Sequence, residues 1–147
     1  MNYTIDTVLE SNEDFSAFLK TKIREFNNEH SIHHENSRQQ GAIQPIHLIV
    51  GDDDGNWIGG IAAEVYWNWV EINDFWLHPN LRGNGLGRLL LQRVEDIAYK
   101  KGATKVLLTT FDFQAKTFYE LHGYVVVGEV KDYPPGSSYY TMVKLLN

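Results

Sequence analysis

The chain has 147 residues, 43% of them hydrophobic, and a formal net charge of −6 at pH 7. This length is typical of one domain and allows a substantial core, so we expect a single domain over residues 1–147. The acidic balance argues against nucleic acid as the main partner, and the absence of cysteine excludes disulfides, thiolate metal sites and a cysteine nucleophile. Residues 1–10 have neither a basic flank nor an apolar run, so we expect a cytoplasmic protein without membrane contact.

The amino-terminal part is predicted to hold a strand over residues 3–8 and then a helix. The segment Ser11-Asn12-Glu13-Asp14 resembles a capping box. Apolar residues follow at helical spacing until about Asn28, at Phe15, Phe18, Leu19, Ile23 and Phe26. Residues 29–44 are polar and lack periodicity, so they form either a loop with a weak helix or a mobile flap over a site.

The rest of the chain reads as strands with two further helices. Strands are predicted over residues 46–50 and 57–67, joined by a turn whose Asp54-Gly55 pair is a hairpin signal. The next strand, 70–77, enters a glycine-rich turn, and an amphipathic helix begins at Leu86. A strand over 104–110, a short helix after Ala115 and strands over 124–130 and 138–146 complete the pattern. The fold class is α/β, with six or seven strands and helices packed on them.

The turn from Leu81 to Gly87 is suited to an anion. The first amides of a helix lack internal partners, the helix dipole is positive there, and glycine lets a ligand approach the backbone closely. A dinucleotide fingerprint would need glycine where Arg88 stands, and the Gly-Lys-Ser/Thr of a Walker loop is absent. The pattern that remains is Arg-x-x-Gly-x-Gly. We interpret it as an anion site, and the alternative interpretation is a plain strand-to-helix turn.

A second pattern follows this turn. Residues 111–124 read as a strand end, a short helix and a stop at Gly123, with Ala-x-x-Phe-Tyr-x-x-x-Gly-Tyr matched from Ala115 to Tyr124. In this order, the two segments resemble the GNAT superfamily of acyl-CoA N-acyltransferases over about residues 46–146. One position departs from the family, because Asp112 stands where asparagine is common, which puts any coenzyme contact of that amide in doubt.

The resemblance implies a GNAT-type fold, with a mixed, mostly antiparallel sheet that is splayed to admit acetyl-CoA as co-substrate. It implies that backbone groups at Phe75, Trp76 and Leu77 pair with the pantetheine arm. The pyrophosphate would lie on the turn and first helical residues, namely Arg82, Gly83, Asn84, Gly85, Leu86, Gly87 and Arg88. Asp112 and Ala115 complete the expected coenzyme contacts. Members of the family often dimerise through their last strands, so the resemblance implies a homodimer.

The implied reaction is direct attack of a neutral amine on the thioester, which needs a base for the amine and a proton for the thiolate. Glu71 is the first candidate for the base, because carboxylates at this offset from the turn serve that role in the histone-acetylating branch. Glu64, Asp74 and an ordered water are the alternatives. Tyr119 is the candidate acid, since a phenol stays protonated at neutral pH. The histidines show no metal-site spacing, so no metal is expected.

We therefore predict an acetyl-CoA-dependent N-acetyltransferase acting on a primary amine of a small molecule or of a protein or peptide. Two alternatives differ in class: a non-catalytic module that senses acyl-CoA, and a toxin-like enzyme that acetylates aminoacyl-tRNA. The retained tyrosine argues against the first and the acidic charge against the second. Aromatic residues are expected to line a pocket for a cationic amine together with Glu64 and Glu71, namely Tyr66, Trp67, Trp69 and Tyr133.

Overall fold

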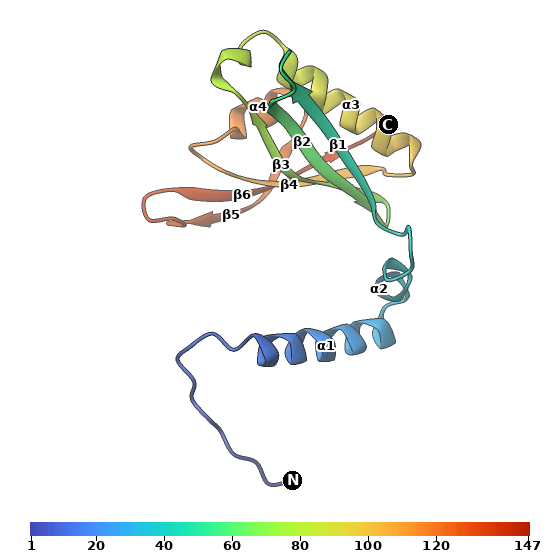
Figure 1. Ribbon diagram of the computed structural model, residues 1–147, viewed down its shortest axis with the longest axis vertical. Coiled ribbons are helices and arrows are strands. Elements are labelled where there is room, and N and C mark those ends of the chain that lie inside the picture. Colours follow the sequence, from blue (N-terminus) through green and yellow to red (C-terminus); the bar gives the residue numbers. More distant parts are fainter. The chain divides into compact units, whose positions relative to one another are not determined.

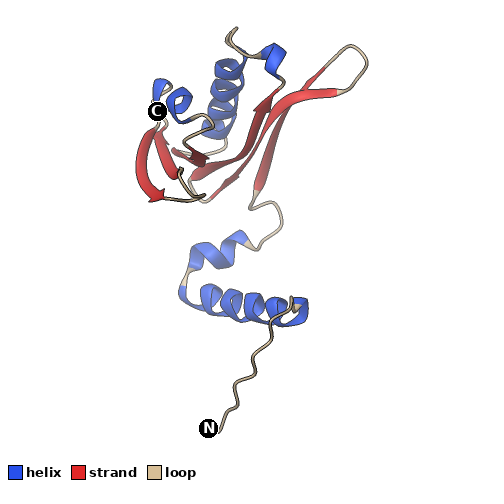
Figure 2. Ribbon diagram, turned by 90° about the vertical axis from the view of Figure 1, so that its left-hand side faces the viewer, coloured by secondary structure: helices blue, strands red, loops and turns tan.

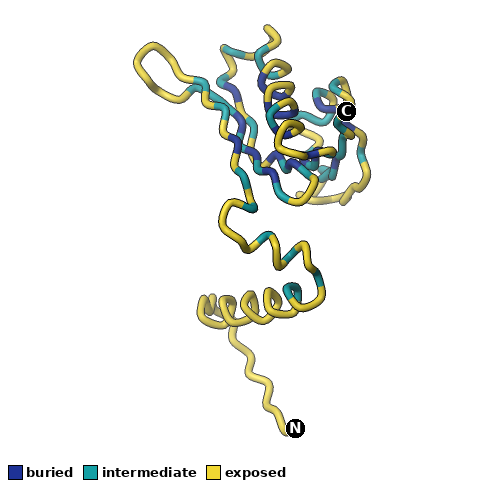
Figure 3. Tube along the Cα trace, turned by 90° about the vertical axis from the view of Figure 1, so that its right-hand side faces the viewer, coloured by how far each residue is buried: buried dark blue, intermediate teal, exposed yellow.

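The computed structural model describes residues 1–147, which form two compact units, 1–39 and 40–147 (Figure 1). The single domain predicted for the whole chain stays a prediction. The hydrophobic core lies entirely within the second unit, as the buried residues in Figure 3 show. No helix in the chain is long and apolar enough to span a membrane.

The first unit consists of two helices, α1 (Glu13–His30) and α2 (Ile32–Ser37). Asn12 caps α1, with its side chain accepting a hydrogen bond from Phe15 N, so the cap lies one residue later than Ser11. The strand predicted over residues 3–8 is wrong, because strands need a paired neighbour and this unit has none. The helix α2 lies in the segment predicted as a loop with a weak helix or a flap. The apolar residues of α1 remain exposed, and the helix buries none of its side chains.

The second unit contains a single six-stranded sheet with the order β1-β2-β3-β4-β6-β5. Its strands are β1 (Gln44–Gly51), β2 (Trp57–Tyr66), β3 (Trp69–Leu77), β4 (Lys105–Phe111), β5 (Val125–Lys131) and β6 (Ser138–Leu145). Only β3 and β4 are parallel, since every other neighbouring pair is antiparallel. The predicted mixed, mostly antiparallel sheet flanked by helices is thus confirmed, with six strands.

Alternation along the strands gives the sheet a buried face. Val70 and Ile72 of β3 are buried with Ala63 of β2, and α3 (Leu86–Lys100) packs over this face with its buried side chains. Figure 2 shows the strands of this unit as one twisted sheet with α3 along one side. Residues of the opposite parity, such as Glu71, point to the other face, where charge can be kept in contact with water.

The strands β3 and β4 separate part-way along their length. They pair only at Trp69–Lys105, Val70–Val106 and Glu71–Leu107, although both strands continue beyond this point. On the other side of β3, a register shift pairs Ala63 with Ile72 but Ala62 with Asp74, so Asn73 is an extra, bulged residue. A bulge bends its strand and increases local twist, and this one lies just after the last pair of β3 with β4.

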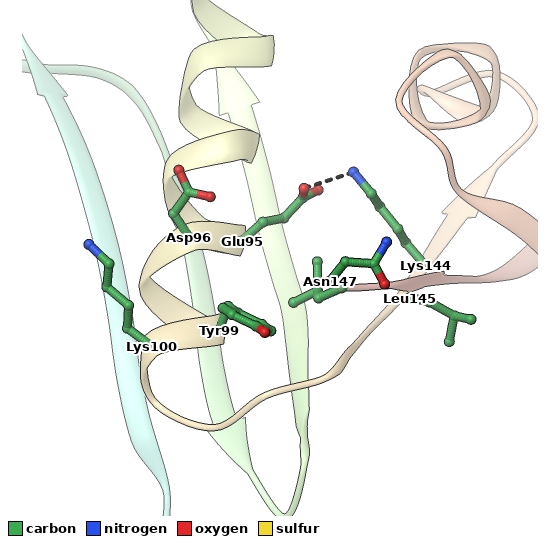
Figure 4. Close-up of a pocket in the computed structure, with 8 residues that line it drawn as sticks. Glu95, Asp96, Tyr99, Lys100, Lys144, Leu145 and Asn147 are labelled. Carbon is green, nitrogen blue, oxygen red and sulfur yellow. Dashed lines mark hydrogen bonds and ion pairs between the residues drawn. The ribbon is translucent and has the colours of Figure 1, made fainter.

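A buried polar network connects α3 to the carboxyl-terminal strands. Glu95 of α3 is only 7% exposed and accepts a hydrogen bond from Tyr124 Oη at 2.8 Å. Its other carboxylate oxygen pairs with Lys144 Nζ of β6, also at 2.8 Å. Figure 4 shows this ion pair reaching across a pocket of about 410 Å³ between α3 and the end of β6. Both carboxylate oxygens are therefore satisfied, as a buried charge requires.

Replacing Lys144 with Met should leave the Glu95 charge buried with Tyr124 alone. We expect Lys144→Met to lower the free energy of unfolding by about 2 kcal/mol, less than for a fully buried pair because Lys144 is partly exposed. Urea denaturation measures this loss. Adding Glu95→Gln to Lys144→Met removes the uncompensated charge and should restore part of the lost free energy of unfolding. Lys100→Met, at an exposed position of α3, is the control. A loss no larger than in this control would contradict the role of the pair.

Candidate active site

The turn between β3 and α3 is shaped by a short 3₁₀ helix and two glycines. The 3₁₀ helix spans Pro79–Leu81, and Arg82 Nε then donates a hydrogen bond back to the carbonyl of Leu77 at 2.9 Å. Gly83 and Gly85 have φ values of 83° and 89°. This left-handed region is costly for residues with a Cβ atom, so glycine at these positions follows from the shape of the turn.

The amino terminus of α3 is open to a ligand. Gly85 is the N-cap and supplies no side-chain hydrogen bond, and Leu86 N has only a 3.4 Å contact with Asn84 Oδ1. Apart from the glycine and its chain neighbours, nothing lies within 4 Å of a Cβ atom built on Gly83 or Gly85. Arg82 and Arg88 are exposed on either side. Unpaired amides, the positive end of the helix dipole and two guanidinium groups together make an anion site.

Gly87 joins the two sequence motifs in space. A Cβ atom at this position would lie 3.4 Å from ring atoms of Phe118 and 3.7 Å from Leu77. Phe118 belongs to α4 (Lys116–Leu121), and its ring lies 6.0 Å from that of Phe75 on β3. Gly87 of α3 therefore lies against Phe118 of α4 at the carboxyl ends of β3 and β4, and a methyl group at this position would make an ordinary contact.

Tyr119 of α4 is buried, with 7% of its surface exposed, and its ring packs against those of Phe118 and Tyr124. Burial raises the pKa of Tyr119 to about 12. Its hydroxyl has no hydrogen-bond partner within the protein, whereas that of Tyr124 is held by Glu95. Burial, followed by the charge and hydrogen bond of Glu95, also raises the pKa of Tyr124. Tyr119 thus remains protonated at neutral pH and keeps its proton available.

Carboxylates gather on the sheet face opposite α3. Glu71 pairs across the strands with Glu64, and the bulge brings Asp74 opposite Ala62 on this same face. Tyr66 Oη donates a hydrogen bond of 2.5 Å to Glu71 Oε2. The pKa of Tyr66 is raised to about 12, first by burial, then by the hydrogen bond and charge of Glu71 and the charge of Glu64. Glu71 is therefore oriented by a hydroxyl that stays protonated.

The other predicted residues fall into different surroundings. Phe75 and Leu77 turn their side chains toward the core, while Trp76 is exposed with its ring 6.3 Å from that of His78. Asp112 is exposed just after β4, where its amide donates to Ser138 O. Ala115 is the N-cap of α4, and its amide contacts Thr110 Oγ1 at 3.4 Å.

The residues of the predicted aromatic wall fall into two groups of ring contacts, and the wall stays a prediction. Tyr66 and Trp69 are cross-strand partners on the carboxylate face, and the ammonium of Lys105 lies 5.2 Å from the Trp69 ring centre. Tyr133 belongs to a separate aromatic cluster with Phe111 and Tyr139 near the ends of β4 and β5. The sequence patterns also did not reveal the Glu95 network, whose members lie 29 and 49 residues apart.

Comparison with known proteins decides the family. Residues 12–124 match the model of the acetyltransferase (GNAT) family. The chain belongs to the GNAT family. Among its GNAT relatives, the blasticidin-S acetyltransferase of Streptomyces morookaense is 37% identical over 93 residues, which are 63% of this chain and 68% of that protein.

Solved GNAT structures agree. The crystal structure of an acetyltransferase from Bacillus cereus has a TM-score of 0.79 at 28% identity and covers 96% of this chain and 98% of its own. A Bacillus anthracis acetyltransferase solved in complex with acetyl coenzyme A has the same fold, with a TM-score of 0.61 at 21% identity over 82% of this chain and 72% of its own. As a GNAT acetyltransferase, the chain uses acetyl-CoA as its co-substrate.

Measurement of acetyl-CoA binding tests whether the anion site at the amino terminus of α3 binds the coenzyme. We expect Gly85→Glu to weaken the affinity for acetyl-CoA at least about tenfold, because it places a carboxylate where the pyrophosphate should bind. Gly102→Glu is the matched control. Gly102 also has positive φ, 100°, and open space around it, but it follows the far end of α3. Calorimetric titration measures both, and equal affinities would show that the coenzyme phosphates bind elsewhere.

Proposed function

We propose that this acetyltransferase transfers the acetyl group from acetyl-CoA to a primary amine of a small molecule by direct attack on the thioester. The observation that carries the proposal is the separation of β3 from β4 immediately after Glu71. This separation leaves a gap between a carboxylate face and the helix that holds Tyr119. The amine nitrogen forms its bond to the thioester carbon as the carbon–sulfur bond breaks.

The coenzyme lies across this gap. Beyond Glu71, the edge of β3 that faces β4 has no strand partner, so backbone groups at Phe75 to Leu77 pair with the amides of the pantetheine arm. The pyrophosphate binds at the open amino terminus of α3, from Arg82 to Arg88. The backbone is the main ligand in both places, which explains why glycines rather than charged side chains dominate the motif.

Glu71 is the proposed base. It is the last residue of β3 that still pairs with β4, so its side chain lies where the gap begins. An aliphatic amine has a pKa of ~10.4, and its neutral form costs about 4 to 5 kcal/mol at pH 7, which makes a proton acceptor valuable. Tyr66 holds one oxygen of Glu71 and leaves the other for the amine, directly or through a water. Glu64 and Asp74, on the same face, are the competing candidates.

Tyr119 is the proposed acid. The departing thiolate takes the proton of the phenol, and the proton lost from the amine leaves through the carboxylate face. Solvent then returns one proton to the Tyr119 phenolate, so the net proton count of the enzyme is unchanged over one turnover. The raised pKa of Tyr119 keeps the hydroxyl protonated, and its freedom from protein partners lets it donate to the coenzyme sulfur. Phe118 takes the packing role beside it, against Phe75 and Gly87.

The relatives and the net charge support the proposed acceptor class. Acetyltransferase relatives favour the enzyme over an acyl-CoA-sensing module, and the relative named for blasticidin S supports a small-molecule acceptor over a protein or peptide. The net charge of −6 disfavours the aminoacyl-tRNA alternative. The homodimer stays a prediction; β5 ends the sheet, and its Val125 and Val127 are exposed.

Tyr119→Phe removes the acid while keeping the ring. We expect kcat to fall about 100-fold with acetyl-CoA affinity unchanged, because general acids contribute on the order of 10² to 10⁴. Thiol release gives the rate and calorimetry the affinity. Tyr99→Phe, on the exposed side of α3, should behave as wild type. Full activity of Tyr119→Phe would exclude an essential acid role.

Glu71→Gln removes the base and should change the pH profile. We expect kcat/KM to fall about 100-fold at pH 7 and to recover by nearly tenfold for each pH unit up to about pH 9, where the loss is offset, since the variant depends on amine that is already neutral. Thiol release is measured for Glu71→Gln, Glu64→Gln and Asp74→Asn. A steep profile in one of the other two variants, with Glu71→Gln like wild type, would move the base to that residue.

A further inference from the structure

Besides tyrosines, the structure buries two polar side chains, and only one of them belongs to an ion pair. Glu95 pairs with Lys144, whereas Thr110, 3% exposed, is the last buried residue of β4. It continues the buried face of this strand after Val106 and Leu108, where valine would have the same shape without a polar group. Burying a hydroxyl costs free energy unless hydrogen bonds replace those that it made with water. Core packing therefore does not explain threonine at this position.

The hydroxyl of Thr110 contacts the turn between β4 and α4. As a donor it lies 3.3 Å from Gln114 Oε1 and 3.4 Å from the carbonyl oxygen of Phe111, and it accepts from the amide of Ala115 at 3.4 Å. Gln114 Oε1 also accepts a hydrogen bond from Phe111 N at 2.9 Å, so this side chain folds back to the end of β4. Thr110 and Gln114 together hold the turn between the strand and the helix.

The helix that follows this turn has a weak start. It has six residues, and its N-cap, Ala115, supplies no side-chain hydrogen bond. Alanine is a poor N-cap, and helices this short are marginal by themselves. Tyr119 N donates to the carbonyl of Ala115 at 3.1 Å, while the amide of Ala115 donates to Thr110 Oγ1. Ala115 thus connects the buried hydroxyl to the residue proposed as the acid.

We infer that Thr110 is a positioning residue: its buried hydroxyl fixes the start of α4 and thereby holds the Tyr119 hydroxyl where the coenzyme sulfur is protonated. The inference rests on the proposed function and deepens it. Thr110 acts through Tyr119 and does not itself exchange a proton with the substrate. Because proton transfer needs donor and acceptor within hydrogen-bond reach, a small displacement of the phenol slows turnover. The coenzyme phosphates, proposed to bind at α3, are unaffected by it.

Two substitutions separate the hydroxyl of Thr110 from the shape of its side chain. Thr110→Val keeps the shape and removes the hydroxyl, and Thr110→Ser keeps the hydroxyl. We expect Thr110→Val to lower kcat about tenfold, with the affinity for acetyl-CoA within about twofold of wild type. Thr110→Ser should keep kcat within about twofold of wild type, because the hydrogen bonds remain. Thiol release with 1-aminobutane and with 1,4-diaminobutane gives kcat, and calorimetry gives the affinity.

Thr104→Val is the matched control. Thr104 immediately precedes β4, at the end away from α4, and is exposed. Its hydroxyl also makes a hydrogen bond, to the carbonyl of Asn68 at 3.3 Å. The control therefore removes a hydrogen-bonded hydroxyl beside the same strand without touching the start of the helix. It should keep the kcat of wild type.

A double-mutant cycle tests whether Thr110 acts through the phenol. When Tyr119→Phe is already present, Thr110→Val should lower kcat by less than about twofold, because no acid is left to misplace. A general structural role would instead lower kcat to the same extent in both backgrounds, and this result would overturn the inference.

The outcomes separate the inference from the proposed function. Wild-type kcat in Thr110→Val, an equal loss in Thr110→Ser, or loss of acetyl-CoA binding in Thr110→Val would overturn the role of Thr110 and leave Tyr119 as the acid. Full activity of Tyr119→Phe would overturn both roles. Absence of thiol release by wild type with either amine would overturn the small-amine assignment together with the inference. A kcat loss that Thr110→Ser avoids, and that disappears in the Tyr119→Phe background, supports both.

Discussion

The parallel contact between β3 and β4 is the constraint on which the candidate site depends. A parallel pair is joined by a crossover, here α3, so both strands send their carboxyl ends in one direction. The pair is hydrogen-bonded only as far as Glu71 and Leu107. Past that point, the backbone of β3 loses a partner, and such a loss is tolerated only where water or a ligand takes its place. The bulge at Asn73 and the separation of β3 from β4 thus lie at the same place along β3. The edge of β3 that they leave without a partner is open to a ligand.

The gap between β3 and β4 could close if the two strands moved together. The contacts of α3 and α4 beside the gap oppose this movement. Gly87 of α3 lies beside Phe118 of α4, where even a methyl group would be in van der Waals contact with the ring. At the other end of α3, Glu95 is tied to Tyr124 and Lys144, which precede β5 and lie in β6. Because α3 also packs on β1, β2 and β3, the helix is fixed to the strands on both sides of the gap. Charged groups buried in this way are costly when isolated, but fully paired they specify one arrangement.

Much of the second unit, residues 40–147, follows from local patterns in the sequence. The glycine turn, the start of α3 at Leu86 and the hairpin at Asp52 to Asn56 each have a local signature, and the structure places all three as predicted. The strand expected at residues 3–8 failed because strand pairing is a property of two segments, and one segment shows only propensity. The register that sets Asp74 opposite Ala62 depends on a bulge, and the Glu95 network joins distant residues, so neither had a local signal.

The tyrosines of the site show why position alone does not assign a role. Tyr66, Tyr119 and Tyr124 all have a raised pKa, with burial as the leading cause in each. The carboxylates of Glu71 and Glu95 hold the first and third hydroxyls, so those protons are engaged in orienting neighbours. Only the proton of Tyr119 has no such engagement within the protein. Because an acid must release its proton to the substrate, the hydrogen-bond inventory favours Tyr119 over two residues of the same chemistry, and leaves Tyr66 and Tyr124 as the groups that position the carboxylates.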